Sequence, residues 1–295
     1  MSSSPTSRRV TSGDVSLAVR EHSPAGPGRP TVVLVHGYPD SQDTWGSLVA
    51  RLPLEDWHVV TYDVRGAGLS AAPRGRASYR THHLVDDLVA VLDAVRGDRA
   101  PVHLVGHDWG SVQLWDAVAA EPVHPGLTGR IASFSSVSGP SLDHTAWLTR
   151  RPRGRRLALL RQQLHSLYVV LFCLPVVPVL TWRLGHRVLG PALAAREGLP
   201  RGHWGAGLRR DAVHGLELYR ANVFQRLRRP GRLRTDVPVL VVHPVRDRFL
   251  TAVLAEGLEQ ACSDVRVEQV DAGHWAIVTH AERIAALVRE HVGAH

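Results

Sequence analysis

The sequence predicts an α/β domain with a mostly parallel central sheet, helices on both faces, and a mainly helical segment inserted into the sheet domain. Short apolar runs bounded by turns recur along the chain, helical patterns separate them, and one long stretch interrupts the alternation. With 295 residues and 44% hydrophobic content, the chain can form one large domain with an insertion or two small domains. Because the sheet pattern resumes after the interruption, we expect a core at 1–140 and 236–295 and an inserted helical cap at 141–235.

The strands are predicted in chain order from their apolar patterns. Residues 1–13 are Ser-rich and are expected to be loose, whereas residues 15–19 alternate apolar and polar side chains as a half-buried edge strand does. Six later runs are continuous and rich in β-branched residues, which is typical of strands buried on both faces. They span residues 31–37, 57–63, 101–107, 130–139, 237–243 and 265–271.

Helical patterns fill the intervals between these runs, at residues 79–96, 111–121 and 281–292. The segment between the fourth and fifth runs contains the longest apolar stretch, residues 167–180. That stretch is too short to span a bilayer and carries Pro175 and Pro178, so we expect a helix and a turn that line something apolar.

The basic charge of the chain is carried by arginine alone. The formal net charge is +8, and the densest cluster is residues 150–156. No nucleic-acid-binding motif accompanies these charges, so we expect no nucleic-acid partner. The cluster beside the apolar stretch could rest on an anionic membrane. A solvated loop beside a buried helix is the favoured interpretation, with the remaining arginines scattered over the surface.

Cysteine usage and the N-terminal residues bear on the compartment. The two cysteines, Cys173 and Cys262, have no CxxC spacing, so neither a zinc site nor a disulfide framework is expected. Residues 1–13 contain no apolar run of the kind found in secretory signals. We therefore expect a cytoplasmic location.

The sequence GHDWGS, residues 106–111, falls where the third buried run should give way to a helix. The pattern Gly-x-Asp-x-Gly at such a corner is typical of a nucleophile elbow, in which the central residue, here Asp108, projects above the sheet. A helix N-terminus favours negative charge, so a carboxylate there stays ionised and can attack carbon. The alternative is an ordinary N-cap aspartate with two chance glycines.

Further polar motifs follow other predicted strands. HGYPDS (36–41) follows the first buried run, DVRGAGLS (63–70) follows the second, Asp247 follows the fifth, and His274 follows the sixth. The carboxyl ends of parallel strands meet at one edge of a sheet, where ligands bind in open α/β folds. The order nucleophile, acid, histidine favours a catalytic triad of Asp108, Asp247 and His274.

Together these motifs resemble the α/β-hydrolase superfamily and, within it, the epoxide hydrolases. An aspartate nucleophile separates that branch from the serine esterases. The segment SLYVVLFCLP (166–175) offers Tyr168, and LYRANVF (218–224) offers Tyr219, at the positions where epoxide hydrolases carry two cap tyrosines. Residues 131–144 further resemble a subgroup in which the hydrolase is fused to a short-chain dehydrogenase.

The resemblance implies that a hydrophobic epoxide is converted to a vicinal diol through an ester on Asp108, without metal or cofactor. It also implies an oxyanion hole made by the amides of Tyr38 and Trp109. Three further residues are expected to contact substrate: His36, Pro39 and Trp275. A haloalkane dehalogenase, an ester or lactone hydrolase, and a non-catalytic binding protein stay open as alternatives, as do the oligomeric state and the particular substrate.

Overall fold

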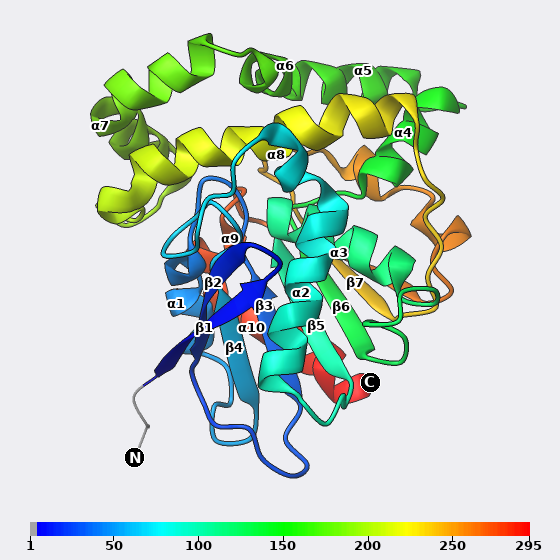
Figure 1. Cartoon of the computed structure of the whole chain (residues 1–295). Coiled ribbons are helices and arrows are strands. Elements are labelled where there is room, and N and C mark those ends of the chain that lie inside the picture. The colour runs from blue at the N-terminus through cyan, green and yellow to red at the C-terminus, as the bar shows by residue number, and fades with distance from the viewer. Residues whose placement is uncertain (1–4) are drawn as a thin grey trace.

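The computed structural model describes residues 5–295, which form one eight-stranded sheet flanked by helices (Figure 1). The strands are β1 (Thr6–Ser12), β2 (Val15–Glu21), β3 (Thr31–Val35), β4 (His58–Tyr62), β5 (Val102–His107), β6 (Ile131–Val137), β7 (Val239–Pro244) and β8 (Val265–Val270). Their spatial order is β1-β2-β4-β3-β5-β6-β7-β8. The β1–β2 and β2–β4 pairs are antiparallel, and all pairs from β4 to β8 are parallel. The predicted mostly parallel sheet is confirmed.

Helices cover both faces of this sheet, and the pleat of β3 shows why. Val33 and Val35 belong to a core with the helices of one face, whereas Val32 and Leu34 belong to a core with the helices of the other. A strand buried on both faces needs apolar side chains on both sides of its pleat, as residues 32–35 have. The first face carries α2 (Thr81–Val95) and α3 (Trp109–Ala120), and the second carries α1 (Gly46–Val49), α9 (Ala276–Thr279) and α10 (Ala281–Ala294).

Two expectations about the sheet edges were wrong. Residues 1–13 were expected to be loose. Residues 1–4 lie outside the described part of the chain, but Thr6–Ser12 forms β1 and pairs along its whole length with β2, which is therefore not an edge strand. The sixth apolar run was expected to be buried on both faces. It forms β8, the opposite edge, where most side chains are at least partly exposed and Val267 keeps 45% of its accessible surface.

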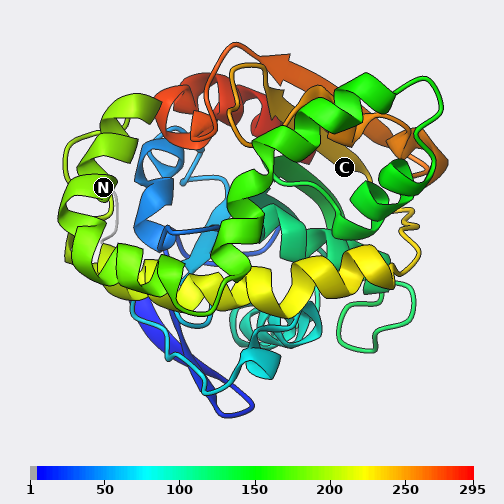
Figure 2. The same ribbon diagram turned by 90° about the horizontal axis from the view of Figure 1, so that it is seen from above.

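Five helices between β6 and β7 lie across the carboxyl ends of the parallel strands (Figures 1 and 2). We call these helices the cap. They are α4 (Leu142–Arg150), α5 (Arg156–His165), α6 (Leu167–Cys173), α7 (Val177–Glu197) and α8 (Leu208–Arg228). In the view from above, α8 crosses the molecule, and α5, α6 and α7 lie with it over the sheet (Figure 2).

One arginine joins two cap helices to the helix that follows β5. Arg226 on α8 donates two hydrogen bonds to Asp116 of α3, at 2.8 and 2.9 Å, and its Nε donates to Asp143 of α4 at 2.9 Å. The two carboxylates are nearly buried, with side-chain exposures of 12% and 6%. Since one guanidinium hydrogen-bonds to both carboxylates, this cluster fixes α8 over α3.

Candidate active site

The backbone at Asp108 has a conformation that requires the glycines on either side. Asp108 has φ +52° and ψ −121°, outside the usual regions for a residue with a side chain. A Cβ at Gly106 would lie 2.6 Å from the backbone of Ser111, and one at Gly110 would overlap the carbonyl of Val35. The strands β3 and β5 and the helix α3 thus approach so closely that only glycine fits at these two positions. The side chain of Asp108 is turned away from the sheet, toward the cap.

The two oxygens of the Asp108 carboxylate have different partners. Oδ1 accepts a hydrogen bond from the backbone N–H of Tyr38 at 2.7 Å, and Oδ2 lies 3.5 Å from Nε2 of His274. Trp109 opens α3, where the first backbone amides have no partner within the helix. The Asp108 side chain keeps 13% of its accessible surface, so the carboxylate is not sealed inside the fold.

His274 and Asp247 form a buried pair beside this carboxylate. Nδ1 of His274 lies 2.8 Å from Oδ2 of Asp247, whose other oxygen accepts the amides of Phe249 at 2.8 Å and Leu250 at 3.1 Å. Burial alone would lower the pKa of His274, but the charges and hydrogen bonds of Asp247 and Asp108 outweigh it and raise that pKa to about 10. Burial would raise the pKa of Asp247, yet His274 and the two amides hold it below its usual value.

The cap brings two phenols together beside Trp109, the residue after Asp108. Tyr168 comes from α6 and Tyr219 from α8, and their ring centroids are 6.2 Å apart. Tyr219 also packs edge-on against Trp109, with centroids 5.0 Å apart. Burial raises the pKa of both phenols, and the negative charge of Asp108 raises each pKa further. Both groups therefore stay protonated at neutral pH close to the carboxylate.

The three residues expected to contact substrate are all buried next to the candidate site. The ring of His36 is buried, with Nδ1 2.9 Å from the Gly37 carbonyl and Nε2 accepting the Val64 amide at 3.0 Å, so it holds two loops together beneath the site. Trp275 is also buried, and its Nε1 donates to Asp40 at 2.9 Å. The polar groups of both rings are thus used within the protein, and contact of these two residues with substrate stays a prediction. Pro39 is buried beside Tyr38 and Trp109 in the loop after β3.

The turn DVRGAGLS is tied to the loop after β3 through one carboxylate. Asp63 accepts the backbone amides of Gln42 and Leu69, each at 2.7 Å. Arg65 forms two hydrogen bonds with Asp87 of α2, at 2.7 and 2.6 Å. These buried contacts fix the turn against the sheet, so its polar residues serve the scaffold of the site.

Residues that no motif singled out complete the surroundings. Asp40 is buried and accepts Nε1 of Trp204, at 2.6 Å, in addition to the indole of Trp275. Phe249 packs between Tyr168 and His274, with centroid distances of 5.3 and 4.9 Å. The loop sequence HGYPDS contains the Asp40 carboxylate, but its indole partners lie more than 160 residues away and give no local signal.

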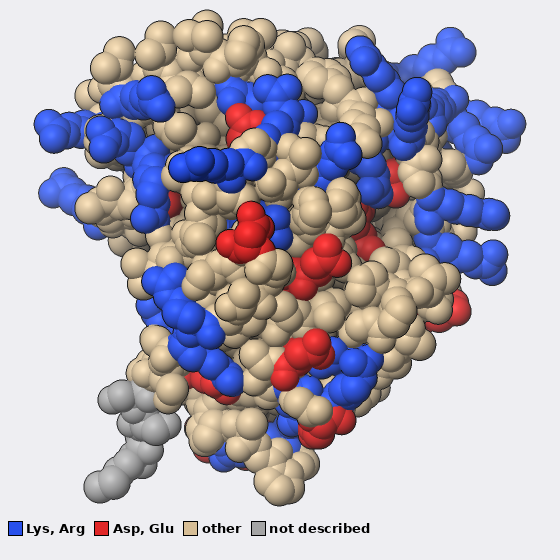
Figure 3. All heavy atoms as spheres, viewed as in Figure 1, with Lys and Arg blue, Asp and Glu red and all other residues tan. Residues whose placement is uncertain are grey.

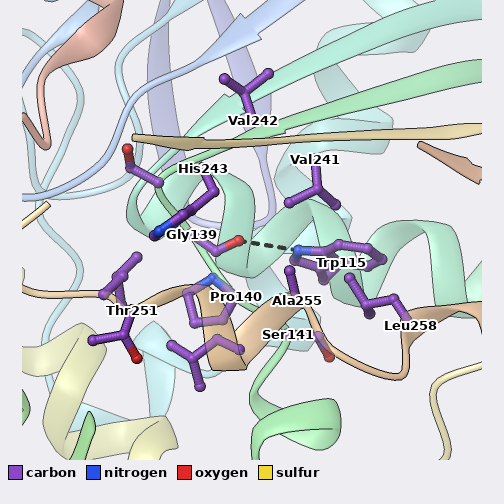
Figure 4. Close-up of a pocket in the computed structure, with 13 residues that line it drawn as sticks. Trp115, Gly139, Pro140, Ser141, Val241, Val242, His243, Thr251, Ala255 and Leu258 are labelled. Carbon is purple, nitrogen blue, oxygen red and sulfur yellow. Dashed lines mark hydrogen bonds between the residues drawn. The ribbon is translucent and has the colours of Figure 1, made fainter. Parts of the chain in front are cut away.

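A small hollow lies beside the site, beneath α4 and the turn η4 (Ala252–Ala255). It is lined by 13 residues that include Gly139, Pro140 and His243, and Trp115 Nε1 donates to the Gly139 carbonyl at 3.1 Å (Figure 4). Asp108 and His274 do not line it, so it neighbours the candidate active site without being part of it. Within residues 5–295, no group of three His, Cys, Asp or Glu side chains is arranged to hold a metal ion.

Solved structures and a family model identify the fold. A family model described as alpha/beta hydrolase fold matches residues 30–158. An epoxide hydrolase from Bacillus megaterium, solved with an inhibitor, superposes with a TM-score of 0.81 at 20% identity, covering 97% of this chain and 100% of that one. Epoxide Hydrolase A from Mycobacterium thermoresistibile gives 0.74 at 24% identity, covering 97% and 98%. The chain has the α/β-hydrolase fold, as predicted.

Two relatives indicate which hydrolases this sequence resembles. The chain is 35% identical to a probable oxidoreductase, EphD, of Mycobacterium tuberculosis, over 96% of this chain and 49% of the relative. It is 38% identical to Epoxide hydrolase A of the same organism, over 47% of this chain and 40% of the relative. The chain thus spans about half the length of the EphD relative. Its expected resemblance to epoxide hydrolases is confirmed.

Proposed function

We propose that the protein hydrolyses a hydrophobic epoxide to a vicinal diol through a covalent ester on Asp108. One arrangement carries this proposal: a single carboxylate faces a backbone amide on one oxygen, an acid-paired imidazole on the other, and two protonated phenols of the cap. A serine at the elbow suits attack on acyl carbon. A carboxylate instead forms a hydrolysable ester after attack on saturated carbon.

In the first half-reaction, Oδ2 of Asp108 attacks an epoxide carbon from the side opposite the C–O bond. As that bond breaks, Tyr168 or Tyr219 donates its proton to the departing oxygen, which becomes a hydroxyl group, and a phenolate is left behind. The raised pKa of both phenols ensures that a proton is present to give. The aromatic rings packed against Tyr168 favour an apolar substituent on the epoxide.

In the second half-reaction, the phenolate left by ring opening takes the proton of the His274 imidazolium, whose pKa falls once Asp108 is esterified. The neutral imidazole then takes a proton from water, and the resulting hydroxide adds to the Cγ atom of the Asp108 ester. The oxyanion forms on Oδ1, within reach of the Tyr38 amide and next to the free amide of Trp109. Collapse of this intermediate expels the diol oxygen, which receives the proton from His274. Asp108 then ionises, and the proton it releases restores the His274 imidazolium. The balance is one epoxide and one water to one diol.

A single-turnover experiment in ¹⁸O-labelled water tests this scheme. With enzyme in excess over styrene oxide, the first diol should contain unlabelled oxygen taken from Asp108, and the label should appear in the peptide that contains residue 108. Label in the first diol would instead show direct attack by water and would overturn the covalent step. Halide release from a chloroalkane, or cleavage of an ester or lactone, without any diol from epoxides would favour one of the alternative activities.

A further inference from the structure

The charge of the protein is divided sharply between the cap segment and the rest. Residues 141–235 contain 18 arginines and four acidic residues, a formal charge of +14. The other 200 residues contain 17 arginines and 23 acidic residues, a formal charge of −6. Although the arginines are divided almost equally between the two parts, the net positive charge of the protein comes entirely from the cap segment.

The acidic residues of the cap segment do not offset this charge at its surface. Asp143, Glu197 and Asp211 are buried, and Glu217 is paired with Arg76 and Arg220. Fifteen of the 18 arginines are exposed, and they gather on both flanks of the cap (Figure 3). They are Arg150, Arg151, Arg153, Arg156, Arg161, Arg183, Arg187, Arg196, Arg201, Arg209, Arg210, Arg228, Arg229, Arg232 and Arg234.

Between these flanks, α5, α6 and α7 expose large apolar side chains, which we call the apolar face. Figure 3 shows the top of the molecule, where α6 and α7 lie, mostly without charged side chains. Leu157 of α5 is 80% exposed, Leu167 of α6 is 61% exposed, and Leu184 of α7 is 81% exposed. The other members are Leu160, Leu164, Val170, Leu171, Leu174, Val176, Val177, Leu180, Val188 and Leu189.

The spacing on α7 is that of a helix lying in a membrane interface. Leu180, Leu184 and Val188 repeat every four residues and form one exposed stripe, and Arg183 and Arg187 form an adjacent exposed stripe. Within residues 5–295, no single helix is long and apolar enough to cross a bilayer. Only α6 and α7 taken together have the length and apolar composition of a membrane span, and the two helices meet at a bend of 103°.

We propose that the apolar face and its flanking arginines dock the cap on the surface of an anionic lipid bilayer. The apolar side chains would enter the boundary between headgroups and acyl chains, and the guanidinium groups would contact lipid phosphates. A second copy fits this face less well because two segments of charge +14 would repel each other. A nucleic acid would meet the arginines but leave the apolar side chains exposed.

The face lies directly over the candidate active site but does not depend on it. The short helix α6 turns Tyr168 and Phe172 inward, where their rings pack with Tyr219, and turns Leu167 and Leu171 outward. The bilayer would thus lie one helix away from Asp108. Docking can be measured without turnover, so it can fail while epoxide hydrolysis holds, and the reverse.

Co-sedimentation of the full chain with vesicles tests the proposal. The protein should bind vesicles containing about 30% phosphatidylglycerol in phosphatidylcholine, should bind pure phosphatidylcholine far more weakly, and should be released by about 0.5 M NaCl. A variant with Arg183→Gln and Arg187→Gln should bind about 25-fold more weakly, at about fivefold for each arginine near an anionic surface. A variant with Leu184→Asp and Val188→Asp should lose binding because it removes apolar contact and adds negative charge.

Matched control substitutions lie on the surface of the sheet domain, outside the cap. Val123→Asp changes a side chain that is 82% exposed in the loop after α3, and Arg51→Gln with Arg289→Gln removes two charges beside α1 and α10. Both controls should bind vesicles like the wild type, and circular dichroism should show that every variant folds. Equal binding to neutral vesicles, or an equal loss in the controls, would overturn the proposal. So would a dimer in sedimentation velocity that only the α7 variants abolish, or tighter binding to duplex DNA than to the vesicles.

Discussion

Nδ1 of His274 lies 2.8 Å from Oδ2 of Asp247, and the two side chains are almost completely buried, with exposures of 3% and 0%. The opposite nitrogen faces a second carboxylate, Asp108, at 3.5 Å. Two negative charges around one imidazole raise its pKa, so the resting enzyme holds an imidazolium at neutral pH. Formation of an ester would neutralise Asp108 and lower that pKa, which makes His274 a base at the stage when a base is needed.

The first prediction concerns the stability of the protein against pH. A histidine whose pKa rises from 6.5 in the unfolded chain to about 10 in the folded one stabilises the fold fully below about pH 6.5. That contribution is lost as the pH rises toward and through about 10. Thermal unfolding should therefore show the Tm of the wild type falling over this range, and falling less steeply in His274→Gln. Parallel Tm curves would show that His274 is not the titrating group.

The second prediction concerns the ester itself. His274→Gln keeps Asp108 and both phenols but removes the base, so the first half-reaction should proceed and the second should stop. Mass spectrometry after incubation with styrene oxide should find one adduct per chain, on the peptide that contains Asp108. The matched control is Asp108→Asn in the His274→Gln background, which lacks the nucleophilic carboxylate and should show no adduct. An adduct elsewhere, or none at all, would contradict the scheme.

The third prediction concerns the cap phenols. Tyr168→Phe or Tyr219→Phe should slow ring opening by roughly 10²–10⁴, the range expected when a general acid is removed, and the phenol that stays should reduce the loss. Changing both should remove activity. Tyr62→Phe is the control, because Tyr62 is a buried phenol of β4 whose hydroxyl has no hydrogen-bond partner in the described part of the chain. Pre-steady-state diol formation would separate these cases, and equal rates in all variants would exclude the phenols as acids.

The sequence predicted the parts of the fold whose signals are local. Continuous β-branched runs predicted β3 to β7, because a strand with helices on both faces needs apolar side chains throughout. The strand β1 was missed because its sequence TSRRVTS is polar and its pairing depends on the hairpin with β2. Edge position also explains the exposed residues of β8. Neither edge can be recognised before the strand order is known.

The site divides in the same way. The elbow glycines and the strand-end positions of Asp108, Asp247 and His274 could be predicted, since each follows an apolar run. The inward-facing contacts of His36 could not, because they depend on the distance between two loops. The division of charge could be counted from the sequence, but residues 150–156 and the arginines of α7 become neighbours of one apolar face only in the folded cap.

The fourth prediction concerns the attachment of the cap. Arg226→Ala would leave Asp116 and Asp143 nearly buried without their shared cation, and should lower the free energy of unfolding by about 2 kcal/mol. Arg228→Ala, an exposed neighbour on the same helix, should change it by less than about 0.5 kcal/mol. Urea unfolding followed by fluorescence measures both values. Equal effects of the two substitutions would mean that Arg226 contributes only as an ordinary surface residue.

The fifth prediction concerns the elbow. A methyl group at Gly110 would overlap the carbonyl of Val35, which is fixed in the centre of the sheet, so neither the strand nor α3 can move aside. Gly110→Ala should therefore abolish activity and lower the Tm strongly or prevent folding. Gly46→Ala is the matched change, because Gly46 has helical φ and no atom within 4 Å of its missing Cβ. It should keep activity and raise stability by about 0.5 kcal/mol through the reduced freedom of the unfolded chain. If Gly110→Ala folded and turned over epoxide like Gly46→Ala, the close approach of β3 and α3 would not be what positions Asp108.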